Sequence, residues 1–193
     1  CQTAIYGDIL KYYRLLGKNR QAIAYCTSVK HSEQTAEMFN DNGISAISID
    51  GSMSQKERNK KMDMFRNGKV QILCNCNLIS EGVTLPNASV ALLLRPTMSL
   101  PLFIQQACRV LTPVEGKRSI IIDYVNNVQR HGLPTDNHEW SLNKSVEKRK
   151  QHNDDGTLSI RQCSECFRCF KTANKCPYCG YEYEVKGREL KAV

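Results

Sequence analysis

The chain has 193 residues, a formal net charge of +8, a hydrophobic fraction of 41% and a charged fraction of 24%. This composition is typical of a globular protein with room for one ordinary domain and a small appendage. No apolar run approaches the roughly 18 residues of a membrane span, so a membrane-spanning protein is not expected. The first residues, CQTAIYGD, lack a signal-peptide pattern, so a secretory signal is not expected. The basic excess suggests a phosphate-rich partner, and the missing initiator methionine suggests a piece of a longer protein.

Five short apolar runs between residues 20 and 124 are typical of strands that are covered on both faces. They are residues 22–26, 44–49, 70–74, 90–94 and 119–123. The helical patterns between them cover residues 28–43, 52–68 and 99–111. This alternation predicts an α/β fold with a doubly wound parallel sheet, although the order of the strands cannot be read from the sequence.

The ends of two predicted helices carry recognisable signals. Gly43 and Gly68 are expected to end the first two helices, as glycine commonly does. Ser54 and Glu57 match a capping box at the start of the second.

A helix over residues 99–111 would have two contrasting faces. Its apolar face would be formed by Phe103, Ala107, Val110 and Leu111. The opposite face would carry a polar stripe, spaced i, i+4, i+7, made of Gln105, Arg109 and Thr112. Such a stripe is either an ordinary solvated face or one that points at an anion held by something else.

Residues 125–160 are polar and rich in turn-forming residues. We interpret them as a surface linker with a short helix near residues 143–150, anchored by Trp140. Its basic KRK run is expected to be a solvated face. The predicted domains are therefore 1–124, the linker 125–160 and a small unit over 161–193.

Five cysteines lie between Cys163 and Cys179, and four of them form two CxxC pairs. Cys163 and Cys166 are followed, after nine residues, by Cys176 and Cys179. Two such turns supply the tetrahedral four-thiolate set of a structural Zn²⁺ site, so a zinc-binding appendage is predicted. Cys166 and Cys169 also form a CxxC pair, but nine intervening residues close a hairpin more easily than six. Without a metal, the same cysteines would form disulfides or stay as free thiols.

Two further patterns narrow the function. The remaining cysteines are scattered, which does not suit disulfides and fits a reducing, cytoplasmic setting. The sequence contains no GxxxxGK[ST] loop and no GxGxxG pattern, so the α/β domain has no phosphate cradle of its own. A stand-alone nucleotide enzyme is therefore not expected.

Three segments in order, QAIAYC…NDNG (21–43), ISAISI…TLPN (44–87) and SLPLFIQQACRVLTP (99–113), resemble the second RecA-like domain of superfamily-two helicases. The match is closest to RadD-like and phage-encoded DEAD/DEAH-box helicases. Those proteins also show an RPTxS segment, an IIID…RHGLP segment and a C-terminal double-CxxC knuckle. Here these are RPTMS (95–99), IIIDYVNNVQRHGLP (120–134) and the cysteines above.

The resemblance implies one half of a motor. In these helicases ATP and Mg²⁺ lie between two RecA-like domains, of which the second closes over the nucleotide and grips one nucleic-acid strand. The family pattern QxxGRxxR maps onto Gln105, Cys108, Arg109 and Thr112. Arg109, together with Gln105, would act catalytically on a phosphate bound by an N-terminal lobe of the same protein. The alternative is that Arg109 is a surface salt-bridge residue.

Two positions depart from that pattern. Cys108 replaces a glycine, and Thr112 replaces the second arginine, which often contacts the γ-phosphate. Such an arginine finger is worth roughly 10³–10⁵ in rate. Either Arg109 acts alone, or Arg95 or Arg118 substitutes, or hydrolysis is weak.

The segment NCNLISEGVTLP resembles the fifth helicase motif. The resemblance places Glu81, Gly82 and Thr84 at the nucleotide, and Cys76 and Asn77 near the nucleic-acid backbone. The alternative is a strand-to-helix turn in which Asn77 caps a helix and Gly82 supplies an unusual backbone angle.

Further strand contacts are expected where strands end and helices begin. Thr27 and Ser28 follow the first strand, and Gly51 and Ser52 follow the second. Exposed amides and hydroxyls at such places hold phosphates without reading bases, so sequence-tolerant contact to one strand is predicted. As the nucleic-acid partner we expect DNA rather than RNA, although these contacts do not distinguish the two. Ser28 and Ser54 would also cap helices in any protein.

The sequence is also compatible with two different functions. One is a non-enzymatic zinc knuckle that binds nucleic acid through a stacking and phosphate surface. That surface would consist of Phe167, Phe170, Lys171, Lys175 and Tyr178. The other is a small α/β enzyme with its nucleophile in CNCN (74–77), which lacks a basic phosphate-binding loop.

Overall fold

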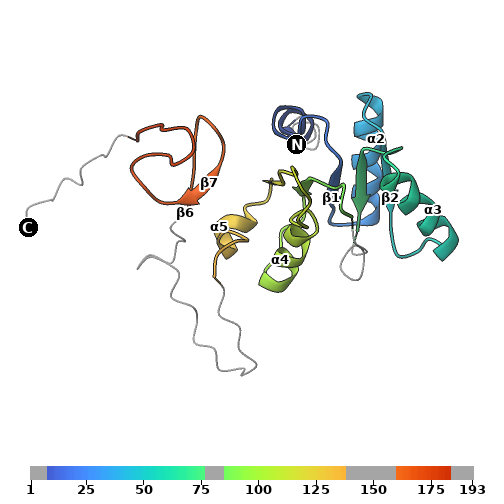
Figure 1. Ribbon diagram of the computed structural model, residues 1–193. Helices are drawn as coiled ribbons and strands as arrows, with labels where there is room; N and C mark the ends of the chain where they lie inside the picture. The colour runs from blue at the N-terminus through green and yellow to red at the C-terminus, as the bar shows by residue number, and fades with distance from the viewer. Residues whose placement is uncertain (1–7, 77–84, 138–159, 184–193) are drawn as a thin grey trace, which may run out of the picture. The chain divides into compact units, whose positions relative to one another are not determined.

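The computed structural model describes residues 8–76, 85–137 and 160–183, which belong to two compact units, Cys1–Asn127 and Val128–Val193 (Figure 1). The first unit contains a five-stranded sheet in which all neighbouring strands are parallel. Its strands are β1 (Ala22–Tyr25), β2 (Ala46–Ile49), β3 (Ile72–Asn75), β4 (Val90–Leu93) and β5 (Ile120–Asp123). Their order in the sheet is β2-β3-β1-β4-β5.

The strands form where the sequence predicts them because they are covered on both faces. Every residue of β1, β3 and β4 is buried, as near-continuous apolar runs require. Ala22 of β1 aligns with Ile72 on one side and with Val90 on the other, so β1 lies at the centre. Each strand overlaps a predicted run, and the predicted α/β fold class is confirmed.

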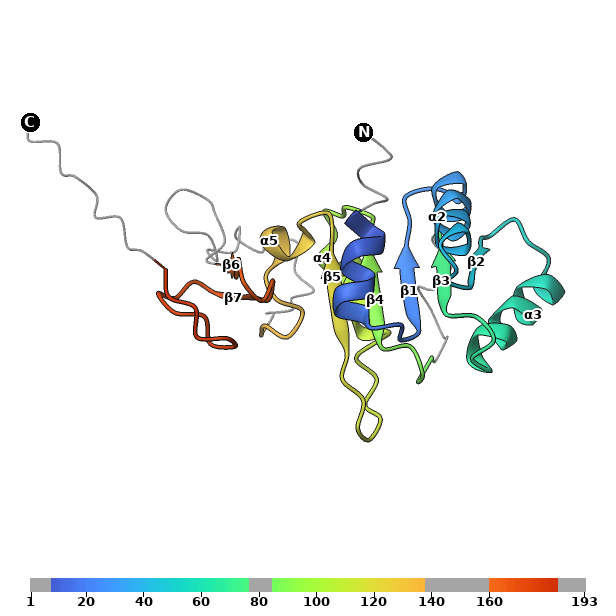
Figure 2. The same ribbon diagram turned by 90° about the horizontal axis from the view of Figure 1, so that it is seen from above.

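Helices cover both faces of the sheet (Figures 1 and 2). They are η1 (Tyr13–Gly17), α2 (Val29–Asp41), α3 (Gln55–Arg66) and α4 (Leu100–Cys108). On one face η1 and α2 meet through the rings of Tyr13 and Phe39, which lie edge to face at 5.5 Å. On the other face the Tyr25 side chain of β1 reaches α4. The sheet is therefore doubly wound.

The amino-terminal helix, residues 8–12 continuing into η1, is not among the predicted elements. Its signal is the spacing of Ile9, Tyr13 and Leu16, which places three apolar side chains on one face. Ile9 and Tyr13 are fully buried. Gly17 is required here, because a Cβ atom at this position would lie 2.8 Å from the Tyr13 ring.

The predicted serine and glycine signals are confirmed at the helix ends, but the Glu57 half of the capping box is not, because its carboxylate pairs with Lys61 at 3.7 Å. Three serine side chains accept a hydrogen bond from the amide three residues ahead, and they are Ser28, Ser54 and Ser99. Gly43 and Gly68 follow the last turns of α2 and α3 with φ angles of 75° and 71°. At each glycine the next amide returns to a carbonyl five residues back, which closes the helix.

The predicted helix over residues 99–111 is too long. α4 ends at Cys108, and the amides of Val110 and Leu111 bond to carbonyls three residues back. This tighter turn comes just before Pro113, because a residue that precedes proline is disfavoured in the helical region. Leu111 is consequently 38% exposed instead of joining the apolar face, and Thr112 lies outside the helix.

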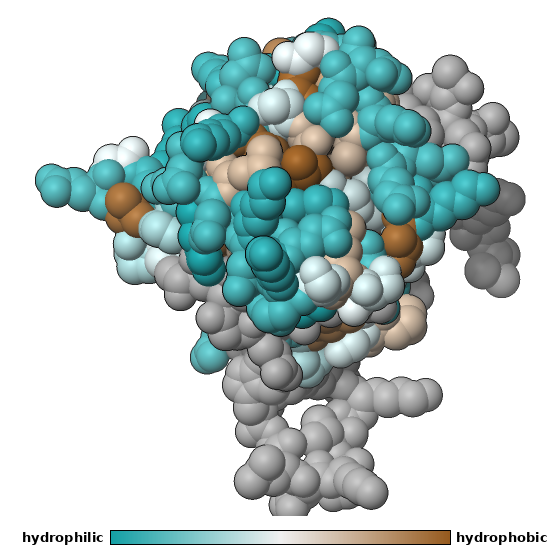
Figure 3. All heavy atoms as spheres, turned by 90° about the vertical axis from the view of Figure 1, so that its right-hand side faces the viewer, coloured by the Kyte–Doolittle hydropathy of each residue, from teal (hydrophilic) through white to brown (hydrophobic). Residues whose placement is uncertain are grey.

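The edge strand β2 has side chains over its outward backbone groups. The side chain of Asn40 accepts from the amide of Ala46 at 2.9 Å and donates to its carbonyl at 3.0 Å. Lys61 donates to the carbonyl of Ser48 at 3.0 Å. The surface on the α3 side of the molecule is mainly hydrophilic (Figure 3).

The second unit contains a small hairpin. β6 (Ile160–Gln162) pairs antiparallel with β7 (Cys169–Lys171), and the short helix α5 (Asn127–His131) begins where the first unit ends. Trp140 and the predicted helix at 143–150 lie outside the described residues. Within the described ranges, no helix has the length and apolar character needed to cross a membrane.

Candidate functional site

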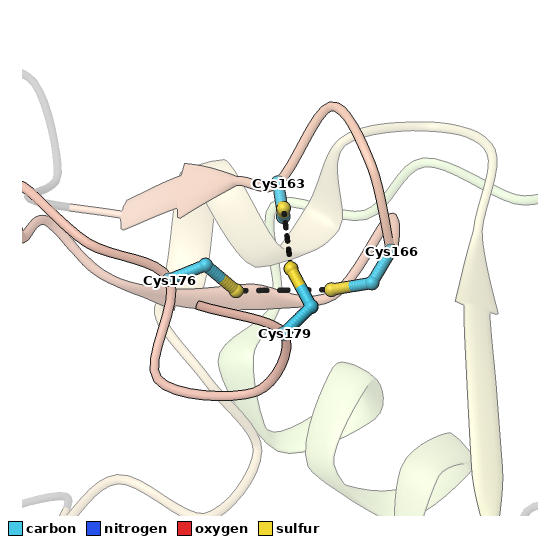
Figure 4. A group of neighbouring side chains, drawn as sticks. All are labelled: Cys163, Cys166, Cys176 and Cys179. Atoms are coloured by element: carbon cyan, nitrogen blue, oxygen red, sulfur yellow. Dashed lines mark hydrogen bonds between the residues drawn. The ribbon is translucent and has the colours of Figure 1, made fainter. Parts of the chain in front are cut away.

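Four cysteine sulfurs converge in the second unit (Figure 4). They belong to Cys163, Cys166, Cys176 and Cys179, and all lie within 4.8 Å of one another. The Sγ atoms of Cys163 and Cys179 are 3.6 Å apart, and those of Cys166 and Cys176 are 3.7 Å apart. A tetrahedron with Zn–S bonds of about 2.3 Å has sulfurs about 3.8 Å apart. The cluster can therefore hold a metal ion.

The two CxxC turns have the same backbone pattern. The carbonyl of Cys163 accepts from the amide of Phe167 at 3.0 Å, and the carbonyl of Cys176 accepts from the amide of Gly180 at 3.0 Å. Phe167 and Gly180 both have positive φ angles, 59° and 79°. The matching turns pair Cys163 with Cys166, whereas Cys169 belongs to β7 and is not part of the cluster.

The thiols of the cluster differ in acidity. Burial opposes ionisation of Cys163, but hydrogen bonds from the amides of Cys166 and Glu165 outweigh it and lower its pKa to about 6. For Cys179 an amide hydrogen bond favours the thiolate, but burial and the neighbouring sulfurs raise the pKa to about 12. The pKa of Cys176 is lowered by amide hydrogen bonds despite burial, and the pKa of Cys166 is raised by burial, so each close sulfur pair joins a more acidic thiol to a less acidic one. Four thiolates this close together require a bound cation.

The prediction that Phe170 belongs to an exposed stacking surface on the knuckle is wrong. Phe170 is only 3% exposed and packs among the cysteines, because the small hairpin needs an apolar core. Lys171 pairs with Asp136 at 3.4 Å, and Lys175 pairs with Glu182 at 3.0 Å. Tyr178 does remain half-exposed, with the guanidinium of Arg168 5.0 Å from its ring centre.

The carboxyl ends of β2, β3 and β1 lie side by side and bring several predicted residues to one edge of the sheet. Thr27, after β1, is exposed, and its hydroxyl lies 3.0 Å from Nδ1 of His31. Ser28 is exposed, and its Oγ caps α2 by accepting from the His31 amide at 3.1 Å. The capping role expected of Ser28 is therefore present.

Gly51 and Ser52 are exposed after β2, and they follow Asp50, a buried carboxylate that is not among the predicted residues. The Asp50 side chain is 2% exposed and accepts from both the amide and the hydroxyl of Ser52. These hydrogen bonds lower the pKa of Asp50 despite its burial, and the bond from the Ser52 hydroxyl has the largest effect. The positive charge of Lys61 lowers the pKa further. The DGS sequence is the signal, since aspartate commonly bonds to an amide two residues ahead.

Cys76, after β3, is largely buried, and its amide bonds to the Ile49 carbonyl of β2 at 3.4 Å. The neighbouring Asn75 is buried and donates to the Ala24 carbonyl of β1 at 3.1 Å. These bonds join the three strands at the edge. The other predicted residues of this motif, Asn77, Glu81, Gly82 and Thr84, lie outside the described residues.

Gln105 and Arg109 are both half-buried at the end of α4. The Tyr25 hydroxyl of β1 donates to the Gln106 carbonyl at 3.0 Å and fixes this end of the helix. Burial raises the pKa of Tyr25, and the nearby positive charge of Arg109 opposes that rise. Tyr25 thus ties the end of α4 that precedes Arg109 to the central strand.

Arg95 and Arg118 are the two candidate substitutes for the arginine that Thr112 replaces, and they lie at opposite ends of the strands. Arg95 comes just after β4, and Arg118 comes just before β5. The carbonyl of Thr112 instead accepts from Lys117 at 3.2 Å, and the same amine bonds to the Pro86 carbonyl at 3.0 Å. Lys117 is not among the predicted residues, and no short motif marks it.

Residues 6–112, more than half of the chain, match the helicase conserved C-terminal domain. The chain belongs to this helicase family. The predicted C-terminal domain of a superfamily-two helicase is thereby confirmed.

Two relatives illustrate the similarity. A 51.5 kDa protein of a Lactococcus phage (isolate 7-9) is 36% identical over 190 residues, which are 97% of this chain and 41% of the relative. The putative ATP-dependent helicase IRC3 of Saccharomyces cerevisiae is 35% identical over 96 residues, 49% of this chain and 14% of the relative. The chain thus spans less than half the length of these relatives.

Solved structures share the fold at low identity. The C-terminal domain of the DEAD-box protein Dbp5 gives a TM-score of 0.56 at 19% identity, over 64% of this chain and 70% of that chain. A DEAD box protein from Methanococcus jannaschii gives 0.53 at 22% identity, over 61% and 32%. Both likenesses concern the architecture alone.

Proposed function

We propose that this chain is the second motor lobe of an ATP-dependent nucleic-acid helicase or translocase. It closes on ATP and Mg²⁺ held by an N-terminal lobe of the same protein and grips one nucleic-acid strand. The observation that carries this proposal is the match of residues 6–112 to the helicase C-terminal domain, which includes the segment with Arg109. The lack of a phosphate loop in this sequence also favours a partner lobe.

In this proposal Arg109 and Gln105 act on the phosphates, and Glu81, Gly82 and Thr84 lie at the nucleotide. Arg109 is a suitable residue because a guanidinium presents several donors in a planar fork that matches phosphate oxygens, and because Arg109 lies at the end of a helix tied to the central strand. A cation that meets the terminal phosphate stabilises the charge that develops during transfer. Closure of the lobes would therefore be linked to ATP, and opening to its hydrolysis.

Strand contact is proposed along the carboxyl edge of the sheet, with DNA favoured over RNA. The contacting residues are Thr27, Ser28, Gly51, Ser52, Cys76 and Asn77. Gly51 supports this role, because its φ angle is not positive and, among the described residues other than its two chain neighbours, none has an atom within 4 Å of the place a Cβ would take. The fold does not require glycine there, so its missing side chain leaves the backbone open to a phosphate.

For the second unit we propose a structural Zn²⁺ ion bound by Cys163, Cys166, Cys176 and Cys179. The sulfur spacing and the matching turns support four thiolate ligands with no open position. The ion would supply charge neutralisation and a cross-link between the two turns. The boundaries 1–124, 125–160 and 161–193 remain our proposed domain division.

The test replaces Arg109 with alanine in the full-length protein and measures ATP turnover with and without single-stranded DNA and RNA. The expected result is loss of the turnover that nucleic acid stimulates, with normal unfolding behaviour. The matched control is Arg66→Ala. The guanidinium of Arg66 is exposed and forms an ion pair with Asp63 on the same helix, with 3.2 Å between the nitrogen and the oxygen. Normal stimulated turnover in Arg109→Ala would refute the proposed role.

A further inference from the structure

A buried amide side chain holds the loop that leads into α4. Asn127 is fully buried at the start of α5, after the end of β5. Its Oδ1 accepts from the Thr97 amide at 3.0 Å, and its Nδ2 donates to the Arg95 carbonyl at 3.0 Å. An amide is suited to this task, because it offers an acceptor and a donor together, as a peptide group does.

The hydrogen bonds continue from this loop to the helix. The hydroxyl of Thr97, itself buried, accepts from the Ser99 amide at 3.0 Å. The hydroxyl of Ser99 in turn accepts from the Leu102 amide at 3.3 Å and caps α4. Three successive side chains, Asn127, Thr97 and Ser99, therefore set where α4 begins.

The far end of α4 is fixed separately, by the bond from Tyr25 to the Gln106 carbonyl. Gln105 and Arg109 lie near that end of this nine-residue helix. A helix held at both ends presents such side chains in one place, whereas a helix with a loose start can shift or fray. The same bonds hold the backbone of Arg95.

We infer that Asn127 is a positioning residue for Arg109, acting through Thr97, Ser99 and the start of α4; the inference rests on the proposed function of Arg109. Asn127 does not touch the nucleotide in this scheme. Its contribution is to keep α4, and with it Arg109, in the position that closure on the nucleotide requires.

The first test compares Asn127→Ala with Asn40→Ala in the full-length protein. Asn40 makes the same kind of two-bond amide clamp, on Ala46 at the start of β2, away from α4. We expect Asn127→Ala to lower kcat for nucleic-acid-stimulated ATP turnover about 10- to 100-fold, the loss a small misplacement of a catalytic group can cause. We expect Asn40→Ala to leave kcat within about twofold.

The second readout is amide hydrogen exchange over residues 96–103. Asn127→Ala should lose protection there, and Asn40→Ala should keep it. Unchanged protection in Asn127→Ala would overturn the inference. Hydrogen exchange can be measured without any enzymatic activity. If the wild-type protein shows no stimulated ATP turnover, the proposed function fails, but the exchange data still decide whether Asn127 holds the start of α4.

A second pair of variants covers the case in which Asn127→Ala does not fold. Thr97→Val removes only the hydroxyl that accepts from Ser99, and Thr97→Ser retains it. The valine variant should lose exchange protection at Leu102 and lower kcat, while the serine variant should restore both. Equal exchange protection and equal kcat in the two variants would overturn the inference that Asn127 acts through Thr97 and Ser99.

Discussion

Replacing Tyr25 with phenylalanine removes a single oxygen atom that ties the central strand to α4. Tyr25 is 4% exposed, and its hydroxyl donates to the Gln106 carbonyl at 3.0 Å. In a longer helix that carbonyl would accept from the amide of Val110. Here the Val110 amide bonds to Ala107 instead, because α4 has already tightened at its end.

The expected cost follows from this geometry. Removing the donor leaves a buried carbonyl without this partner, which costs about 1–3 kcal/mol of folding free energy. The ring itself stays, so no cavity of consequence forms. Loss of the bond also frees the end of α4 beside Arg109, so kcat for stimulated ATP turnover should fall about 10-fold or more.

Urea unfolding and steady-state ATP turnover of the full-length protein measure the two effects. The matched control is Tyr124→Phe, whose hydroxyl donates to the Ile9 carbonyl at 3.0 Å on the opposite face of the sheet. Both variants should lose similar stability, but only Tyr25→Phe should lose kcat. If the two variants lower turnover equally, or if Tyr25→Phe costs less than about 0.5 kcal/mol, the reasoning is refuted.

Two more outcomes are expected. Cys166→Ser should release zinc, whereas Cys169→Ser should retain one ion per chain; elemental analysis after dialysis tests this, and zinc loss from Cys169→Ser would contradict the assigned ligands. Burial raises the pKa of Tyr13 to about 12, so the unfolded chain ionises first above pH 10. The contribution of Tyr13 to stability should therefore be constant below about pH 10 and fall as the pH rises towards 12. Unfolding at stepped pH should show the difference in stability between wild type and Tyr13→Phe narrowing above about pH 10, and a constant difference would contradict the assignment.

Local patterns in the sequence predict much of this fold. The apolar runs mark all five strands of the sheet, because β1, β3 and β4 are buried on both faces and the edge strands β2 and β5 are partly buried. Serine and glycine mark helix ends because their chemistry acts within a few residues. The spacing of Cys163, Cys166, Cys176 and Cys179 predicts their convergence for the same reason.

Features that depend on distant contacts could not be predicted. The strand order rests on pairing between segments such as β1 and β4, which no local pattern encodes. The roles of Asp50 and Asn127 depend on burial and on partners supplied by the folded backbone. The early end of α4 is a different case, because Pro113 gives a local signal for it that the predicted range 99–111 does not take into account.

The side chains over β2 limit what this sheet can join. Asn40 and Lys61 already bond to backbone groups that face outward from the strand. An extended peptide arriving at that margin finds few donors or acceptors to template its own pairing. Edge-to-edge aggregation and strand exchange between molecules are therefore disfavoured at the β2 edge, even at high protein concentration.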